Sequence, residues 1–314
     1  MVSPVTSVSI LDKLRGAGIP RPKADPELAG GLRKWLEDSL AADVARLGVR
    51  GRALRVNNEA LGRLRPSESV PSSLRPRDAT TGELALLRLV RCLFRQWITT
   101  GCIDDPISDA LSGEAASGDP GGAVALVSRM SGKERVAFTD AVGAHAARIT
   151  ATWPALSAAW LPRVHERFTV PLCGGRVMLS GIADLVIGPH AASEASVCIV
   201  SVQAGRLRGE HRTDLHFLAL LETLRAGAAP SRIATYYTGT GELHAEPVDE
   251  PLLVAALLRT ISGVETLCSQ MQCSQHPDSQ QQGSQQQGSH QQGRASVGSR
   301  SEPFDLAETR TGAA

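Results

Sequence analysis

Three polar residues on two neighbouring predicted strands could do chemistry together. Asp184 lies in a predicted strand over residues 177–187, and an acid on a half-apolar strand face is unusual. Ser201 and Gln203 lie two residues apart in a second predicted strand, 197–203, so their side chains project from one face. Carboxylate oxygens are ligands for hard cations such as Mg²⁺, which makes Asp184 the candidate metal ligand. By period two, the face of Asp184 also carries Met178, Ser180, Ile182 and Val186.

The order of motifs and elements around these residues resembles the PD-(D/E)XK nuclease superfamily, in its RecB-type exonuclease branch. Residues 181–184 read Gly-Ile-Ala-Asp, as in the Gly-x-x-Asp strand of the family. Residues 201–203 read Ser-Val-Gln, where the family has acid-x-Lys. A predicted helix over 215–226, a strand over 233–238 and a closing helix follow in the family's order. The resemblance implies an α/β, restriction-endonuclease-like core: a mixed central sheet of about five strands flanked by helices, with a mainly helical N-terminal portion.

Further positions of the family pattern are also substituted or ambiguous. Its Gly-x-x-x-His helix signature corresponds to residues 82–86, where Leu86 replaces the His. The Tyr that the family places on the helix over 215–226 corresponds to Leu220, or to Leu218 in another register. Glu166, in a predicted strand over 163–172, resembles an acid that often precedes the nuclease strands. An exposed acid at the entrance of a strand is the alternative interpretation.

The substitutions remove groups that the resemblance implies for the nuclease reaction. Two acids would hold Mg²⁺ and a Lys would orient the attacking water. Here Asp184 is the one acid, Ser201 offers a neutral hydroxyl, and Gln203 brings no cation. We therefore predict a catalytically degenerate nuclease-like protein without a cofactor, retained for DNA binding or protein contact.

Two alternatives to the degenerate nuclease stay open from the sequence. One is an active Mg²⁺-dependent DNA nuclease that hydrolyses phosphodiesters with Asp184 and migrated partners among Glu166, Glu194 and Glu210. The other is a structural or regulatory protein that binds no nucleic acid. The sequence does not indicate which protein would be a partner.

Basic charge is concentrated in the first part of the chain. Residues 1–100 contain 17 Lys and Arg against 10 Asp and Glu, whereas the whole chain has a net charge of +1. This asymmetry fits a footprint on a phosphate backbone, or equally well a set of solvated arginines. Much of the Arg-rich stretch 46–77 is expected to be loop because it contains three prolines. The candidate DNA-binding residues are Arg50, Arg52, Arg55, Arg206, Arg208 and Arg212.

Composition and periodicity divide the chain into four regions. We expect a flexible leader over 1–26, a helical region over 27–160, the nuclease-like core over 161–268 and a disordered tail over 269–314. Apolar residues at helical spacing predict helices over 26–47, 82–100 and 133–150, with a loop over 101–122. The tail is rich in Gln, Ser and Gly, which cannot bury enough apolar surface to offset the entropy of ordering. Its Gln runs are either an interaction segment or a neutral extension.

Cysteine usage and hydropathy suggest a cytoplasmic protein with reduced thiols and no membrane contact. The six cysteines include no CxxC pair. Some RecB-type nucleases carry an iron–sulfur cluster, but the third closely spaced cysteine is missing here, so we expect none. No run approaches the roughly 18 apolar residues of a membrane span, and no signal-peptide pattern is present.

Overall fold

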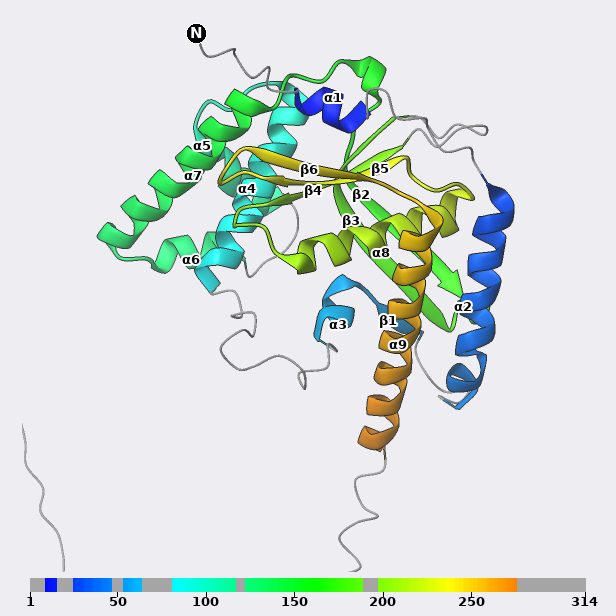
Figure 1. The fold of residues 1–314 in the computed structure, drawn as a ribbon. Helices are drawn as coiled ribbons and strands as arrows, with labels where there is room; N and C mark the ends of the chain where they lie inside the picture. The colour runs from blue at the N-terminus through cyan, green and yellow to red at the C-terminus, as the bar shows by residue number, and fades with distance from the viewer. Residues whose placement is uncertain are drawn as a thin grey trace, which may run out of the picture. The chain divides into compact units, whose positions relative to one another are not determined.

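The core of the protein is one mixed sheet of six strands (Figure 1). The computed structural model describes residues 9–15, 25–46, 53–63, 81–116, 122–188 and 197–275. The predicted α/β class is confirmed, and the additional strand comes from the Arg-rich stretch expected to be largely loop. The strands are β1 (Leu54–Val56), β2 (Arg163–Leu172), β3 (Val177–Ile187), β4 (Cys198–Gln203), β5 (Arg232–Tyr237) and β6 (Glu242–Pro247).

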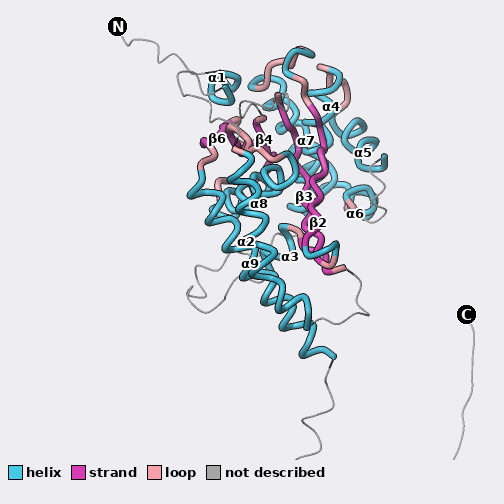
Figure 2. The backbone as a smooth tube through the Cα atoms, turned by 90° about the vertical axis from the view of Figure 1, so that its right-hand side faces the viewer, coloured by secondary structure: helices cyan, strands magenta, loops and turns pink. Residues whose placement is uncertain are grey.

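β3 organises the sheet because three strands pair with it. β2 runs antiparallel along one edge, from Leu172 opposite Val177 to Arg163 opposite Val186, and Figure 2 shows these two long strands side by side. On the other edge, β1 pairs in parallel at residues 177–179 and β4 pairs antiparallel at 185–187. No described strand pairs with residues 180–184 on that edge, so a gap opens between β1 and β4. Beyond β4, β5 pairs in parallel and β6 antiparallel.

Helices cover both faces of the sheet and form two cores (Figure 1). On one face, α8 has an unbroken buried run from Leu215 to Leu224 because sheet and helices surround it, as its nearly all-round apolar pattern predicts. That face is covered by α2 (Pro26–Arg46), α8 (Gly209–Ala226) and α9 (Glu250–Gln275), with α3 (Asn58–Arg63) nearby. The opposite face is covered by α1 (Ile10–Arg15), α4 (Thr81–Thr100), α5 (Pro106–Ala116), α6 (Ala123–Arg129) and α7 (Gly132–Thr152).

The structure differs from the sequence expectation at three helix positions. Residues 106–116, expected in a loop, form α5, because Asp105 accepts the N–H of Ser108 at 3.3 Å and Ala110 is fully buried. Helix α8 begins at Gly209, before the expected start at residue 215, and its N-cap residue Arg208 makes no side-chain cap bond. Helix α9 continues to residue 275, into the predicted tail, and residues 276–314 lie outside the described ranges.

The regions expected over 27–160 and 161–268 belong to one compact unit. By contacts the chain divides into Met1–Gln272 and Cys273–Ala314. Within the segment expected to be a flexible leader, residues 10–15 form α1, whose Leu14 is buried in the core of the α4 face. Part of the predicted leader is therefore folded onto the sheet.

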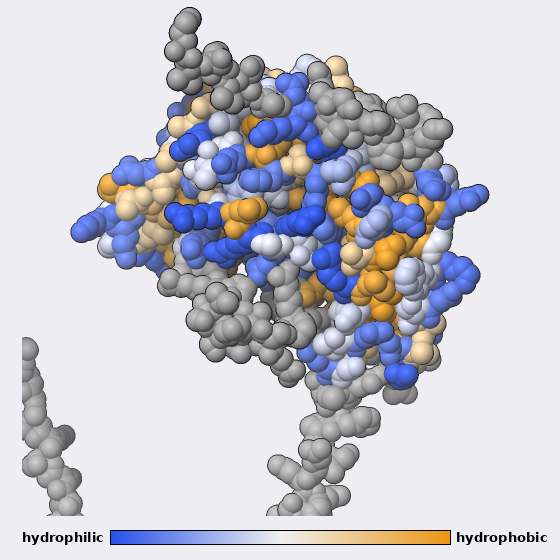
Figure 3. All heavy atoms as spheres, in the orientation of Figure 1, coloured by the Kyte–Doolittle hydropathy of each residue, from blue (hydrophilic) through white to orange (hydrophobic). Residues whose placement is uncertain are grey.

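One helical stretch, Glu250–Met271 of α9, is long and apolar enough to cross a membrane by length and composition alone. This corrects the expectation that no run approaches that length. Half of the apolar window is buried within the protein, as in a core helix of a soluble protein. Leu258 of α9 and Trp35 of α2 are exposed, and Figure 3 shows apolar residues gathering on the side where these two helices lie.

Candidate functional site

Asp184 lies where β3 and β4 stop pairing. The ladder between the two strands ends at Leu185 opposite Val200. One residue further, Oδ2 of Asp184 accepts the backbone N–H of Val202 at 2.7 Å. The carboxylate therefore satisfies a β4 amide that has no ladder partner on β3, and the end of the pairing is held by a side chain.

A helix on the α4 face supplies the cation for Asp184. Nε of Arg91, in α4, lies 3.3 Å from Oδ1 of Asp184 and also donates to the carbonyl of Val202 at 3.2 Å. The Asp184 side chain is only 11% exposed and that of Arg91 is 35% exposed. Oδ2 thus accepts an amide N–H, while Oδ1 forms an ion pair with a guanidinium. The sequence does not single out Arg91, because nothing in its local pattern indicates this pair.

Ser201 and Gln203 share a face of β4, as period two requires. Both residues are buried, and Nε2 of Gln203 donates to Oγ of Ser201 at 3.4 Å. The backbone carbonyl of Gln203 accepts two hydrogen bonds from Thr238, one from its backbone N–H at 2.9 Å and one from its hydroxyl at 3.2 Å. Between them, the Val202 side chain packs in the core of the opposite face. The resemblance would place an acid and a Lys at these two positions, which are here a neutral, mutually bonded pair on the face beneath α8. Asp184 instead pairs with Arg91 of α4, which covers the opposite face, so the expected grouping of the three residues on one face is not observed.

The faces of β3 change phase at Asp184, which departs from strict period two. Leu179 and Ala183 pack in the core beneath α8, and Leu185 packs in the opposite core. Val186 is back beneath α8, so it does not continue the face of Ile182 as expected. On β2, His165 lies between Val164, which is opposite Leu185, and Glu166, which is opposite Ala183, and its backbone is left-handed with φ 56°. A left-handed residue in β2 interrupts the alternation of both paired strands at this level.

Glu166 does not join Asp184. Its carboxylate lies 3.6 Å from Nη2 of Arg225, which also contacts Glu222 at 2.8 Å and lies over the Phe168 ring at 5.1 Å. Arg225 belongs to α8, whereas the partner of Asp184 belongs to α4, and these helices pack on opposite faces of the sheet. Glu166 therefore ties β2 to α8. Of the other acids considered as migrated partners, Glu210 lies in the first turn of α8 and Glu194 lies outside the described residues.

The candidate DNA-binding arginines fall into three groups. Arg206 and Arg208 are exposed in the connection between β4 and α8, and Arg55 is exposed on β1. Arg212 instead makes three contacts of 2.6–3.0 Å with the Glu246 carboxylate. A guanidinium held in this bidentate way is committed to its carboxylate. Arg50 and Arg52 lie outside the described residues.

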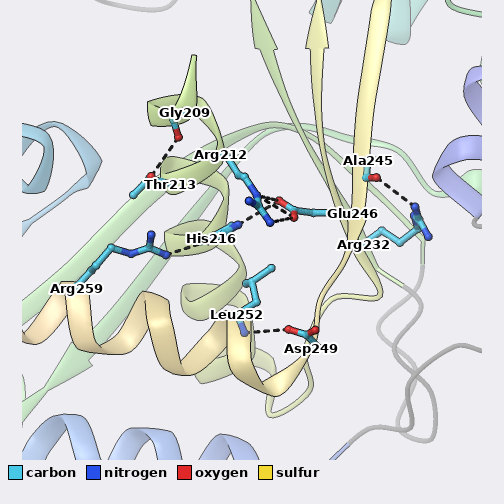
Figure 4. Close-up of polar contacts among 10 residues, drawn as sticks. All are labelled: Gly209, Arg212, Thr213, His216, Arg232, Ala245, Glu246, Asp249, Leu252 and Arg259. Atoms are coloured by element: carbon cyan, nitrogen blue, oxygen red, sulfur yellow. Dashed lines mark hydrogen bonds and ion pairs between the residues drawn. The ribbon is translucent and has the colours of Figure 1, made fainter. Parts of the chain in front are cut away.

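A second polar cluster joins α8, β6 and α9 away from Asp184 (Figure 4). Nε2 of His216 lies 3.1 Å from Glu246, and Nδ1 lies 2.9 Å from Nη2 of Arg259. Because Arg259 can only donate, Nδ1 accepts and Nε2 carries the hydrogen given to Glu246. Burial lowers the pKa of His216, while its bond to Glu246 acts in the opposite direction. Burial alone would raise the pKa of Glu246, but the bonds from Arg212 and His216 outweigh it and leave the pKa lowered.

The described residues do not fit a metal centre. Among them, no group of three or more His, Cys, Asp or Glu side chains is placed to hold a metal ion. Mg²⁺ takes oxygen ligands in octahedral geometry, whereas Asp184 is a single acid already paired with a guanidinium. Of the cysteines considered for a cluster, Cys92 and Cys268 are buried and Cys102 is exposed. Burial raises the pKa of the Cys92 thiol to about 11, which keeps it protonated at neutral pH.

Comparisons with known proteins add little to this geometry. No family model matches the chain, and no curated protein matches it. Among solved structures, the crystal structure of SSO0001 is similar at a TM-score of 0.29 and 11% sequence identity, over 74% of this chain and 86% of that chain. A likeness of this size carries no argument about function.

Proposed function

We propose that this chain is a catalytically degenerate relative of the PD-(D/E)XK nucleases, with a restriction-endonuclease-like core that is retained to bind DNA. The observation that carries the proposal is the Arg91–Asp184 pair, 3.3 Å from Nε to Oδ1. Where a nuclease of this family would hold a cation between acids, this chain holds its own guanidinium. Ser201 and Gln203, the residues at the acid and Lys positions, are occupied with each other.

DNA is favoured as the ligand by the cations that flank this position. Arg206 and Arg208 are exposed directly after β4, and no ion pair engages their side chains among the described residues. Arginines of this kind contact backbone phosphates and do not distinguish between bases, so the affinity for DNA should be largely independent of the DNA sequence. Each neutralised phosphate contributes about −0.9 to the slope of log affinity against log salt for duplex DNA.

The first test is a nuclease assay on single-stranded and duplex DNA with Mg²⁺ or Mn²⁺. We expect no cleavage above background. Metal-dependent cleavage that Asp184→Ala abolishes would show that the protein is an active nuclease, and the partner acid would then have to be found.

The second test measures DNA retention between roughly 50 and 500 mM salt by fluorescence anisotropy. We expect a steep fall with salt, and weaker binding when Arg206 and Arg208 are both changed to Glu. The matched control changes Arg129 and Lys133 to Glu, because both are exposed on α6 and α7 and the change in net charge is identical. DNA retention that does not change with salt concentration would contradict a DNA site at this position. An equal loss of DNA affinity in both double variants would contradict it as well.

A further inference from the structure

His165 lies at the centre of a group of cations that the nuclease resemblance does not explain. It is exposed on β2, and its Nδ1 lies 3.1 Å from Nη2 of Arg95 in α4. Arg91, one helical turn before Arg95, forms an ion pair with Asp184, which precedes Leu185, the β3 residue opposite Val164. Arg167 is exposed two residues further along β2. We call His165, Arg91, Arg95 and Arg167 the His165 cluster.

The charges of the His165 cluster act on one another. Partial burial lowers the pKa of His165, and Arg95 lowers it further, with smaller contributions from Arg167 and Arg91. Asp184 is the one group that acts in the opposite direction. Three guanidinium groups and one carboxylate therefore surround a neutral imidazole, and the surplus charge is positive.

Hydrogen-bond chemistry shows that the cluster is a set of donors. A guanidinium can only donate, so Nδ1 of His165 accepts from Arg95 and Nε2 carries the hydrogen. His165 thus offers an N–H on the opposite side of its ring. The acceptor capacity of Asp184 is engaged by the Val202 amide and Arg91. A group that approaches the cluster meets N–H donors and positive charge.

The backbone at His165 gives a second reason to regard this position as functional. Its φ of 56° lies in the left-handed region, which non-glycine residues adopt infrequently. Residues held in such conformations cost free energy and gather at ligand-binding positions. Here the left-handed residue lies at the level where β3 changes phase.

We infer that the His165 cluster binds an oxyanion, a phosphate group, beside the position where a nuclease of this fold would bind a metal cation. Arg95 and Arg167 would contact the phosphate oxygens together with Nε2–H of His165, and Arg91 would keep Asp184 from repelling it. The inference rests on the proposed DNA function only for the source of the phosphate, which can be a nucleic-acid backbone or a free phosphate. Planar guanidinium groups match phosphate oxygens in geometry as well as charge.

The test uses inorganic phosphate as the probe and the full chain as the protein. Histidine ring signals are followed by NMR during titration with phosphate, against chloride at equal ionic strength, and calorimetry gives the dissociation constant. We expect the His165 signal, assigned with His165→Gln, to shift with saturation, whereas exposed His244 stays unchanged. Arg95→Gln and Arg167→Gln should each weaken binding by about tenfold or more, because each removes a charge-assisted contact. Arg129→Gln is the control and should leave binding unchanged.

The outcomes separate this inference from the proposed function. No saturable shift at His165, or equal weakening by Arg129→Gln, would overturn the phosphate site even where DNA is still retained. Phosphate binding that duplex DNA displaces identifies the nucleic-acid backbone as the source. Phosphate binding that DNA leaves untouched supports the site with a free phosphate as its ligand, and points away from DNA at this position.

Discussion

The Arg91–Asp184 pair leads to a sharp prediction about restoring a metal site. Changing Ser201 to Asp and Gln203 to Lys would rebuild the acid-x-Lys sequence on β4. Both positions share the β4 face beneath α8, and Oδ2 of Asp184 reaches the β4 backbone between them at the Val202 N–H. Nevertheless, we expect this double variant to bind no Mg²⁺, because the guanidinium of Arg91 already occupies Asp184. A triple variant that also carries Arg91→Met should bind it.

The size of the effect follows from the geometry. A dication on Asp184 would lie roughly 5 Å from the guanidinium, and at an effective dielectric constant of about 40 their repulsion is about 3 kcal/mol. The high dielectric constant allows for the 35% exposure of the Arg91 side chain. This repulsion corresponds to roughly a hundredfold in dissociation constant. The double and triple variants should therefore differ by about that factor.

Isothermal calorimetry with MgCl₂ measures this difference, and thermal unfolding checks that each variant is folded. The matched control places Arg88→Met in the double variant, because Arg88 lies on the same helix but contacts Glu114 at 3.6 Å. The control should behave like the double variant. Equal Mg²⁺ affinity in the double and triple variants would refute the reasoning, since Arg91 would then not be what excludes the cation.

Three further predictions concern the fold. Gly181→Ala should lower the free energy of unfolding by about 1–3 kcal/mol, since the new Cβ would lie 2.5 Å from Cδ2 of Leu218. The matched control is Gly143→Ala, whose new Cβ would have no atom within 4 Å, and this change should stabilise α7 by about 0.5–1 kcal/mol. Ser131→Ala should cost about 1 kcal/mol by thermal or urea unfolding, because it removes the hydroxyl that accepts the Glu134 N–H in the capping box of α7. Burial lowers the pKa of His216 in the folded state, so stability should be complete above about pH 6.5 and fall as the pH drops below it, where the unfolded chain takes up the proton. His216→Gln should make that fall shallower by at most about 1.4 kcal/mol per pH unit, and an unchanged slope would show that His216 is protonated equally in both states.

The elements of the core could be predicted from the sequence because each has a strong local signal. The strands expected over 163–172 and 177–187 have those bounds, the strand expected over 197–203 spans Cys198–Gln203, and the helix expected over 215–226 lies within α8. The pairing of β3 with β4 also follows from the two neighbouring strand patterns. These features depend on residues close together in sequence.

What could not be predicted depends on contacts between distant segments. Arg91 and Asp184 are far apart in the chain, and no periodicity connects a polar residue of a helix to a strand acid. The left-handed backbone of His165 is equally invisible, because a histidine inside an otherwise regular strand gives no turn signal. Glu166 illustrates the converse: its place in the strand is as expected, yet Arg225 directs its carboxylate toward α8.

Under the proposed function, the absence of an acid and a Lys at positions 201 and 203 and the cations near Asp184 belong to one change in electrostatics. A metallonuclease has surplus negative charge between its strands, and this charge attracts Mg²⁺. The same charge repels a phosphate until the metal is bound. Here the single acid, Asp184, is neutralised from α4, and Arg95 and Arg167 add positive charge beside it. A site with surplus positive charge attracts phosphate directly and repels the dication. Under the proposed function, Ser201 and Gln203 in place of an acid and a Lys are therefore neutral, or favourable, because the proposed site binds the anion without a metal.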